Sequence, residues 1–227
     1  MLRYTQAILQ VSLLSCMLLC VTSCVKYYEV VKTEFPQGTA KKSPNLVAQY
    51  LKSVSIYDQF KTRALFDVLW LSEVVRTEYV HRYAERRGKD AQAHAELLNR
   101  QLEENKHWIS CYLLADIRDR FNPRLNEKEA LWSVYLRFTN GETIEPVSIK
   151  EVELESEYQN FFGSRFNPFK TVYLVKFPAT NREGEAYPCS PGDFVFVVAA
   201  PDREALVTWS PLHTAENKKQ DEDFYWG

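Results

Sequence analysis

The chain has 227 residues, with 28 Lys and Arg against 30 Asp and Glu, so its formal net charge is −2 at pH 7. So small a net charge does not indicate the excess of Lys and Arg that is typical of proteins that bind nucleic acid. Aromatic residues make up 14 % of the chain and glycine contributes only 7 residues, which argues against a disordered chain and against glycine-rich phosphate loops. This length suits one domain, or one domain with an appended subdomain.

The amino-terminal segment has a basic start and an apolar run from Ala7 to Val21, followed by the small residues Thr22 and Ser23. These three features are typical of a secretory signal. The run is shorter than the ~20 apolar residues of a comfortable membrane span. We therefore expect residues 1–23 to be a signal peptide. A signal cut at another position and an uncleaved membrane helix are the alternatives.

The end of this run, Val21-Thr22-Ser23-Cys24, resembles the lipobox of bacterial lipoproteins. The resemblance implies diacylglycerol transfer to the sulfur of Cys24, cleavage between Ser23 and Cys24, and acylation of the new amino terminus, for example by palmitate. Two or more acyl chains give a stable membrane anchor. Val25 follows in place of Asp, which by analogy with the enterobacterial sorting rule favours the outer membrane over the inner one. The expected location is the bacterial cell envelope, with the membrane bound through the lipid.

A helical region is predicted over residues 43–106. Ser43-Pro44 is a favourable helix start, and apolar residues recur at helical spacing through a first helix and a longer one over residues 57–87. Gly88 suits the left-handed position that ends a helix. A third helix is expected over residues 91–105, so the last two helices should form an antiparallel hairpin.

From residue 107 the hydrophobic period changes from about 3.6 residues to about 2, which is typical of half-buried strands. Asn140-Gly141 is a strong hairpin signal, and Pro146 indicates an edge position or a bulge in the return strand over residues 142–154. About six or seven strands are expected, spaced as in an antiparallel sandwich. The expected inward faces are Ile109, Cys111, Leu113, Ala115 and Ile117; Trp132, Val134, Leu136 and Phe138; and Tyr173, Val175 and Phe177.

Polar side chains offer few candidates for chemistry. Glu78, His81 and Glu85 have the Glu-x-x-His spacing of di-iron bundles, but such a site needs four helices, so we interpret them as a solvated helix face. An Arg63–Asp67 pair is expected on the same face. Alternating glutamates over residues 151–157 are interpreted as an exposed acidic strand.

No nucleophile–base motif or phosphate-binding motif is present. The sequence therefore predicts no catalytic residue, no cofactor and no metal site, and a protein that is not an enzyme.

Cys111 and Cys189 are the cysteines that follow Cys24. An oxidising compartment would permit a disulfide between them, although Cys111 also fits a small buried apolar residue and Cys189 a mobile thiol. The chain ends in Phe224-Tyr225-Trp226, which either folds back on the body or contacts a partner or a membrane interface.

The predicted fold class is α+β, with an N-terminal helical hairpin followed by an antiparallel immunoglobulin-like β-sandwich. The function that we expect is a membrane-tethered, non-catalytic lipoprotein that binds a protein partner or helps to assemble an envelope machine, without nucleic acid. The alternatives are an envelope enzyme with an unrecognised site and a surface lipoprotein that binds a host or a neighbouring cell. The predicted segments are the signal peptide (1–23), a lipidated spacer (24–42), the helical region (43–106), the β-sandwich (107–210) and a polar tail (211–227).

Overall fold

The computed structural model describes residues 46–58, 61–118, 124–127 and 129–210. The predicted signal peptide, the Cys24 anchor, the spacer over 24–42 and the tail over 211–227 lie outside these residues. The strands are β1 (Leu51–Asp58), β2 (Lys61–Trp70), β3 (Trp108–Ile117), β4 (Ser133–Phe138), β5 (Thr143–Ile144), β6 (Ser148–Glu151), β7 (Thr171–Pro178), β8 (Phe194–Ala200) and β9 (Arg203–Thr208). The helices are η1 (Ala48–Tyr50), α2 (Glu73–Arg87), α3 (Ala91–His107), α4 (Ser156–Phe162) and η2 (Gly163–Arg165).

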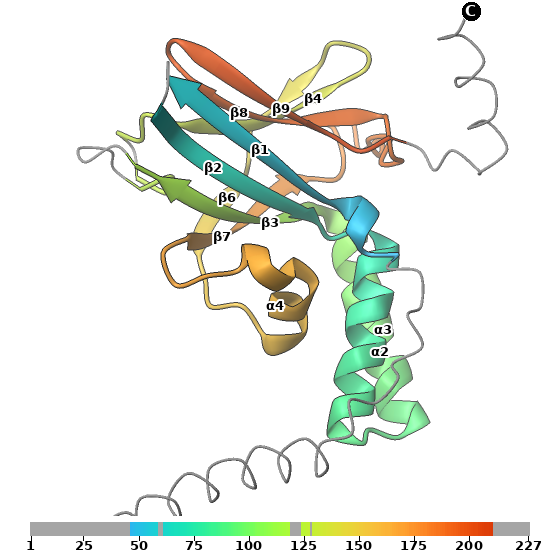
Figure 1. Cartoon of the computed structure of the whole chain (residues 1–227). Coiled ribbons are helices and arrows are strands. Elements are labelled where there is room, and N and C mark those ends of the chain that lie inside the picture. Colours follow the sequence, from blue (N-terminus) through green and yellow to red (C-terminus); the bar gives the residue numbers. More distant parts are fainter. Residues whose placement is uncertain (1–45, 59–60, 119–123, 128, 211–227) are drawn as a thin grey trace, which may run out of the picture. The chain divides into compact units, whose positions relative to one another are not determined.

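These strands form two antiparallel sheets, accompanied by few helices (Figure 1). The first sheet has the strand order β1-β2-β3-β7-β6, and the second has the order β5-β4-β8-β9. The predicted mixture of helices and antiparallel sheets is therefore confirmed.

The two sheets meet across one hydrophobic core. The ring centroid of Phe66 in β2 lies 5.5 Å from that of Trp132, which precedes β4. The ring centroid of Phe177 in β7 lies 6.0 Å from that of Phe196 in β8. The predicted inward faces of β3, β4 and β7 all belong to this core or pack against it. The two-residue period therefore identified the buried face of each of these strands correctly.

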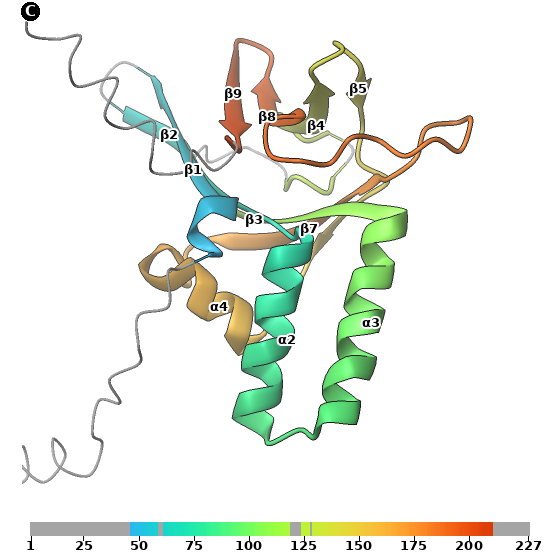
Figure 2. The ribbon, with the colours of Figure 1, turned by 90° about the vertical axis from the view of Figure 1, so that its right-hand side faces the viewer.

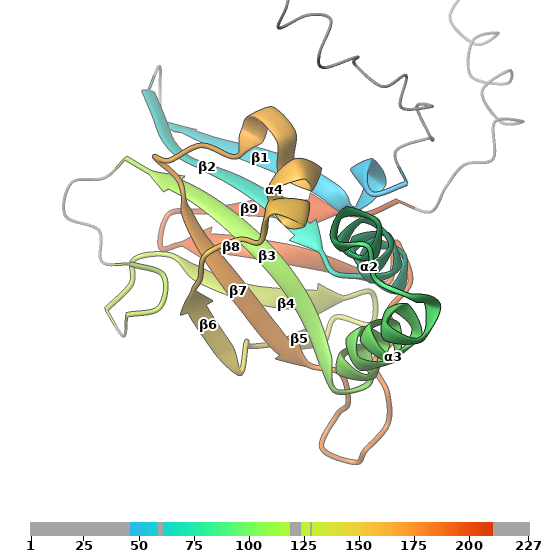
Figure 3. The ribbon, with the colours of Figure 1, turned by 90° about the horizontal axis from the view of Figure 1, so that it is seen from below.

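The predicted helical region over 43–106 is wrong at Leu51–Asp58 and Lys61–Trp70, because these segments are β1 and β2 and form an antiparallel pair. Phe66 and Val68 face the second sheet, while Leu69 lies on the opposite face. α4 and the helical hairpin lie on that side of the first sheet (Figure 3). A strand with both faces buried has no polar alternation, and its apolar run resembles that of a buried helix.

The predicted Arg63–Asp67 pair is also wrong, because it assumed one helical turn between two residues that lie in the strand β2 and have other partners. Asp67 is buried beside Lys170, and Arg63 contacts Asp202 at 3.3 Å.

α2 and α3 form a hairpin that connects β2 to β3, so these helices interrupt the first sheet in the chain and do not precede all of the strands. Ser72 caps α2 by accepting a hydrogen bond from the Val75 N–H, and Asp90 caps α3 by accepting one from the Ala93 N–H. Gly88 ends α2 with a φ of 57°, which glycine adopts without strain. α3 has no buried residue, and the hairpin extends away from the sheets (Figure 2).

α4 follows β6 where the sequence predicted strand. The return strand over 142–154 is split into β5 and β6, and the acidic strand over 151–157 is wrong. Glu155 is the N-cap of α4 and Glu157 lies in its first turn, where the helix dipole favours carboxylates. Glu157 is only 2 % exposed, and its Oε1 lies 3.1 Å from Nη2 of Arg86. These glutamates therefore occupy different environments and share no strand face.

Aromatic contacts hold α2 and α4 on the outer face of the first sheet. The ring of Tyr158 in α4 stacks on Tyr79 of α2 at 4.5 Å and contacts Tyr112 of β3 at 4.8 Å. Tyr79 also donates a hydrogen bond of 2.6 Å to Glu155. The helices therefore bury the outer face of β2 and β3 while the second sheet covers the inner face.

Candidate functional site

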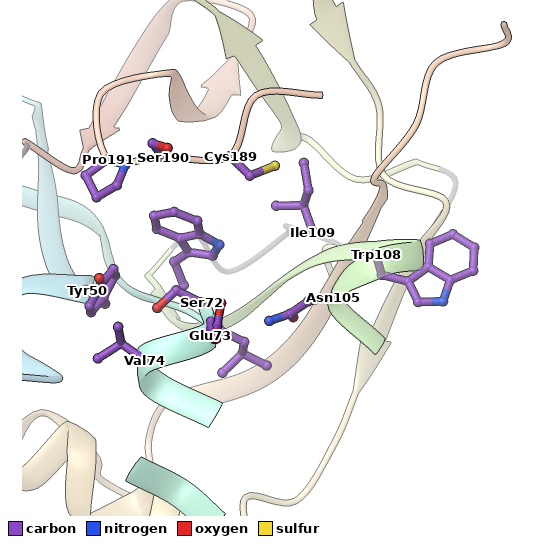
Figure 4. Close-up of a pocket in the computed structure, with 12 residues that line it drawn as sticks. Tyr50, Ser72, Glu73, Val74, Asn105, Trp108, Ile109, Cys189, Ser190 and Pro191 are labelled. Carbon is purple, nitrogen blue, oxygen red and sulfur yellow. The ribbon is translucent and has the colours of Figure 1, made fainter. Parts of the chain in front are cut away.

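A cavity of about 290 Å³ lies where the first sheet meets the helical hairpin (Figure 4). Its walls come from η1, from the β2–α2 and α3–β3 junctions, and from the loop before β8. The lining residues are Tyr50, Trp70, Leu71, Ser72, Glu73, Val74, Asn105, Trp108, Ile109, Cys189, Ser190 and Pro191. Segments that are far apart in the sequence thus converge on one hollow.

Two abrupt changes of backbone conformation shape this cavity. Ser72 has an extended backbone that ends β2 and starts α2 at once. Trp108 is extended directly after α3, so the helix leads into β3 without a loop. The Leu71 N–H donates a hydrogen bond of 2.9 Å to the carbonyl of Ser110, which holds the two junctions side by side.

Tyr50 and Trp70 line the cavity and belong to a buried aromatic cluster. The ring of Trp70 lies 5.5 Å from Tyr50, 5.0 Å from Phe194 and 5.6 Å from Trp209. The indole N–H of Trp209 donates a buried hydrogen bond of 2.8 Å to the carbonyl of Tyr50. This bond ties η1 to the residue that follows β9, so both ends of the described chain meet at the cavity.

Asn105 brings an oriented polar group to the cavity. Its Oδ1 accepts a hydrogen bond of 2.6 Å from Nε of Arg76, whose side chain is buried. The same guanidinium donates to Gln101 at 2.6 Å and lies 3.1 Å from Glu104. Because Arg76 occupies the Asn105 oxygen, the amide nitrogen of Asn105 remains as a donor for the cavity.

Cys189 brings a thiol to the rim, with its sulfur directed toward Ile109 (Figure 4). Partial burial of the thiol and the nearby charge of Asp193 raise the pKa of Cys189 to about 11. The thiol is therefore protonated at neutral pH, and the protonated form is not the nucleophile.

Alkylation of Cys189 by iodoacetamide is expected to be about tenfold slower at neutral pH in the folded chain than in the unfolded chain. The raised pKa lowers the thiolate fraction about 100-fold, and the greater nucleophilicity of the more basic thiolate offsets about half of this on a logarithmic scale. The rate should climb with pH until about pH 11. Peptide mass spectrometry measures it, and Cys189→Ser identifies the signal. A rate that levels off near the ordinary thiol pKa would contradict the environment described for Cys189.

Cys111 and Cys189 are both free thiols in the structure. Cys111 lies on the inward face of β3 opposite Trp70, whereas Cys189 is exposed and lines the cavity beside Trp70. Burial raises the pKa of Cys111. A disulfide between them stays a prediction.

The polar residues singled out in α2 bind one another. Glu78 accepts a hydrogen bond of 2.7 Å from Arg82, and Glu85 lies 3.4 Å from His81. Among the described residues, no group of three or more His, Cys, Asp or Glu side chains could hold a metal ion. In the same part of the chain, no helix is long and apolar enough to cross a membrane.

Sequence reasoning missed most of the cavity. Tyr50 and Trp70 were assigned to helices, and Asn105 was treated as the end of one. The change of period near Trp108 marked one of the two junctions that form the cavity, and Cys189 was singled out only as a possible disulfide partner or a mobile thiol.

Comparison with known proteins adds little. No family model and no curated protein matches the chain. A solved structure of a DUF4426 family protein from Pseudomonas aeruginosa PAO1 is similar at 8 % identity and a TM-score of 0.28, over 72 % of this chain and 98 % of that one.

Proposed function

We propose that this chain is a bacterial lipoprotein, anchored in the outer membrane of the cell envelope through lipid on Cys24. Its body, two sheets of immunoglobulin-like character with an inserted helical hairpin, is a non-catalytic module that holds a protein partner. The observation that carries this proposal is Val21-Thr22-Ser23-Cys24 at the end of a short apolar run. Val25 supports the outer membrane, and two or more acyl chains would make the attachment stable.

The lining of the cavity in Figure 4 supports the binding of a protein partner. Its wall of Tyr50, Trp70 and Pro191, with the Asn105 donor at one side, suits one apolar side chain that projects from a partner. Such an anchor in a desolvated pocket carries much of the energy of a protein interface.

The chemistry at the rim supports a non-catalytic role. A reactive cysteine needs a cationic neighbour or a histidine that lowers its pKa. The charged group that acts on Cys189 is Asp193, and it raises the pKa. Together with the absence of hydrolase motifs from the sequence, this favours a binding module over an enzyme.

The anchor is tested with Cys24→Ser in intact cells. We expect this variant either to accumulate as an uncut precursor or to move to the soluble fraction, because the acylated sulfur is lost. Fractionation and the intact mass of the protein measure the result. Cys189→Ser is the matched control and should keep the membrane location and the acylated mass. An unchanged mature mass with full membrane retention in Cys24→Ser would refute the lipobox assignment.

The partner is tested by crosslinking in living cells. A photoreactive amino acid at the position of Ser190, which is exposed and lines the cavity, should give a discrete protein adduct, and one at Glu96, on the exposed side of α3, should not. Mass spectrometry identifies what is captured. If both positions capture only lipids and abundant bystanders, the binding role is wrong. Protease treatment of intact cells then separates a periplasmic body from one displayed on the cell surface.

A further inference from the structure

The edge of the second sheet is incomplete along the first half of β4. β8 pairs with all six residues of β4, from Ser133 to Phe138. On its other side, β5 pairs only with Leu136 and Arg137. No strand of the described residues therefore lies beside Ser133, Val134 and Tyr135 on that side.

The direction of the backbone groups shows what this edge offers. The Phe138 N–H donates a hydrogen bond of 2.8 Å to the carbonyl of Glu142, across the hairpin to β5. Alternate residues of a strand direct their N–H and C=O to the same neighbour. The N–H and C=O of Leu136 and of Val134 therefore also point to the β5 side, and those of Val134 point to the open edge.

Pro146 explains why β5 stops short. Continuing the β4–β5 register beyond Leu136 and Ile144 would place Pro146 opposite Val134, and proline has no N–H to donate to a strand ladder. The chain leaves the second sheet here, and the Val147 N–H donates at 2.8 Å to the carbonyl of Lys176 in the first sheet. The space beside Val134 is present because the chain passes from the second sheet to the first at Pro146.

A cavity of about 640 Å³ follows this edge, more than twice the volume of the cavity in Figure 4. Its apolar wall includes Trp132, Val134 and Ile149, and its rim includes Glu127 and Glu145. Both glutamates are exposed, and no ion pair among the described residues involves them. Arg137 also lines the cavity, but its guanidinium is bound to Glu204 at 2.7 Å. Within the described part of the chain, the rim therefore presents two carboxylates without a cationic partner beside an apolar wall.

We infer that the open edge of β4 accepts an extended segment of a partner protein as an added strand, with apolar and basic side chains alternating along it. The segment would bond to the N–H and C=O of Val134, place its apolar residues toward Trp132 and Ile149, and place its Lys or Arg residues beside Glu127 and Glu145. Main-chain bonds give such strand addition its affinity, and the side-chain pockets give its specificity. The inference rests on the proposed role as a protein-binding module and names the chemistry of the partner.

The test measures the binding of a short fluorescent peptide that alternates lysine and valine to the full mature chain, by anisotropy. Binding should weaken about tenfold with Glu145→Lys, and further with Glu127→Lys added, because each change places like charges together. Glu96→Lys, on α3, is the control and should bind as the unchanged protein does. A peptide of the same sequence with N-methylated backbone should not bind, since it cannot donate to the β4 edge. Hydrogen exchange at the Val134 amide should slow when the unmodified peptide binds.

Two outcomes overturn the inference: N-methylation leaves binding unchanged, or the charge reversals at Glu127 and Glu145 have no larger effect than Glu96→Lys. Protection of Val134 that depends on protein concentration without peptide would also overturn it, in favour of a second copy of this chain at the edge. If the peptide fails to bind while crosslinking captures a protein elsewhere on the body, the strand-addition site is wrong and the binding role stands.

Discussion

Replacing Trp209 with alanine is expected to lower the free energy of unfolding by about 3–5 kcal/mol, a large part of the ~5–15 kcal/mol that holds a typical domain together. The indole is buried against Trp70 and Phe194, at 5.6 Å and 5.4 Å. Its N–H also satisfies the carbonyl of Tyr50. The substitution therefore leaves a hole in the core and an unsatisfied buried acceptor. Urea unfolding followed by circular dichroism measures the loss.

Two further variants separate the causes of this loss. Trp209→Phe keeps an aromatic ring but removes the donor to Tyr50, so it should cost less than the alanine variant. Trp108→Ala removes a tryptophan of the same size that is only half-buried at the cavity, and it should cost the least. If Trp108→Ala and Trp209→Ala destabilise the protein equally, the packing of Trp209 against Trp70 and Phe194 is not as described.

Replacing Asp67 with alanine is expected to cost about 3–5 kcal/mol, because it removes one partner of a buried ion pair. Asp67 is 4 % exposed. Its carboxylate lies 2.5 Å from Nζ of Lys170 and accepts a hydrogen bond from the hydroxyl of Ser53. Arg165 lies further away, at 3.9 Å. Without the carboxylate, the ammonium of Lys170 stays buried with its charge uncompensated. Thermal and urea unfolding measure the effect.

The loss of stability in Asp67→Ala should come from the uncompensated charge of Lys170, and a double variant tests this. Asp67→Leu combined with Lys170→Met replaces the pair by apolar side chains and should recover most of the stability lost by Asp67→Ala. Asp116→Ala is the control, since Asp116 forms a more exposed pair with Arg118 at 3.1 Å and should cost about 1 kcal/mol or less. A double variant as unstable as the single one would show that Asp67 acts through another contact.

Much of the carboxyl-terminal part of the fold could be predicted from short local patterns in the sequence. Asn140-Gly141 predicted a hairpin, and β4 pairs with β5 across it with Gly141 at a φ of 86°. The two-residue period predicted inward-facing residues of β3, β4 and β7, and all of them belong to the core or pack against it. Pro146 predicted an edge or irregularity, and the chain changes sheets there.

The amino-terminal strands show where this reasoning stops. Residues on both faces of β2 are buried, so the alternation that distinguishes a strand from a helix is absent. Asp67 looked like a surface residue paired along a helix, whereas its true partner, Lys170, is more than a hundred positions away in the chain. Neither error could be corrected from the neighbouring residues alone.

The sequence by itself determined the lipobox resemblance at Cys24, the turn at Gly88, and the core faces of three strands, because each of these depends on residues that are adjacent or regularly spaced. Only the tertiary structure decided that β2 is a strand, that Trp70 and Trp209 pack in one aromatic cluster, and that no strand of the described residues lies beside Val134 on one side of β4. Those features arise from contacts between distant segments, and their energies come from burial and pairing that no local pattern records.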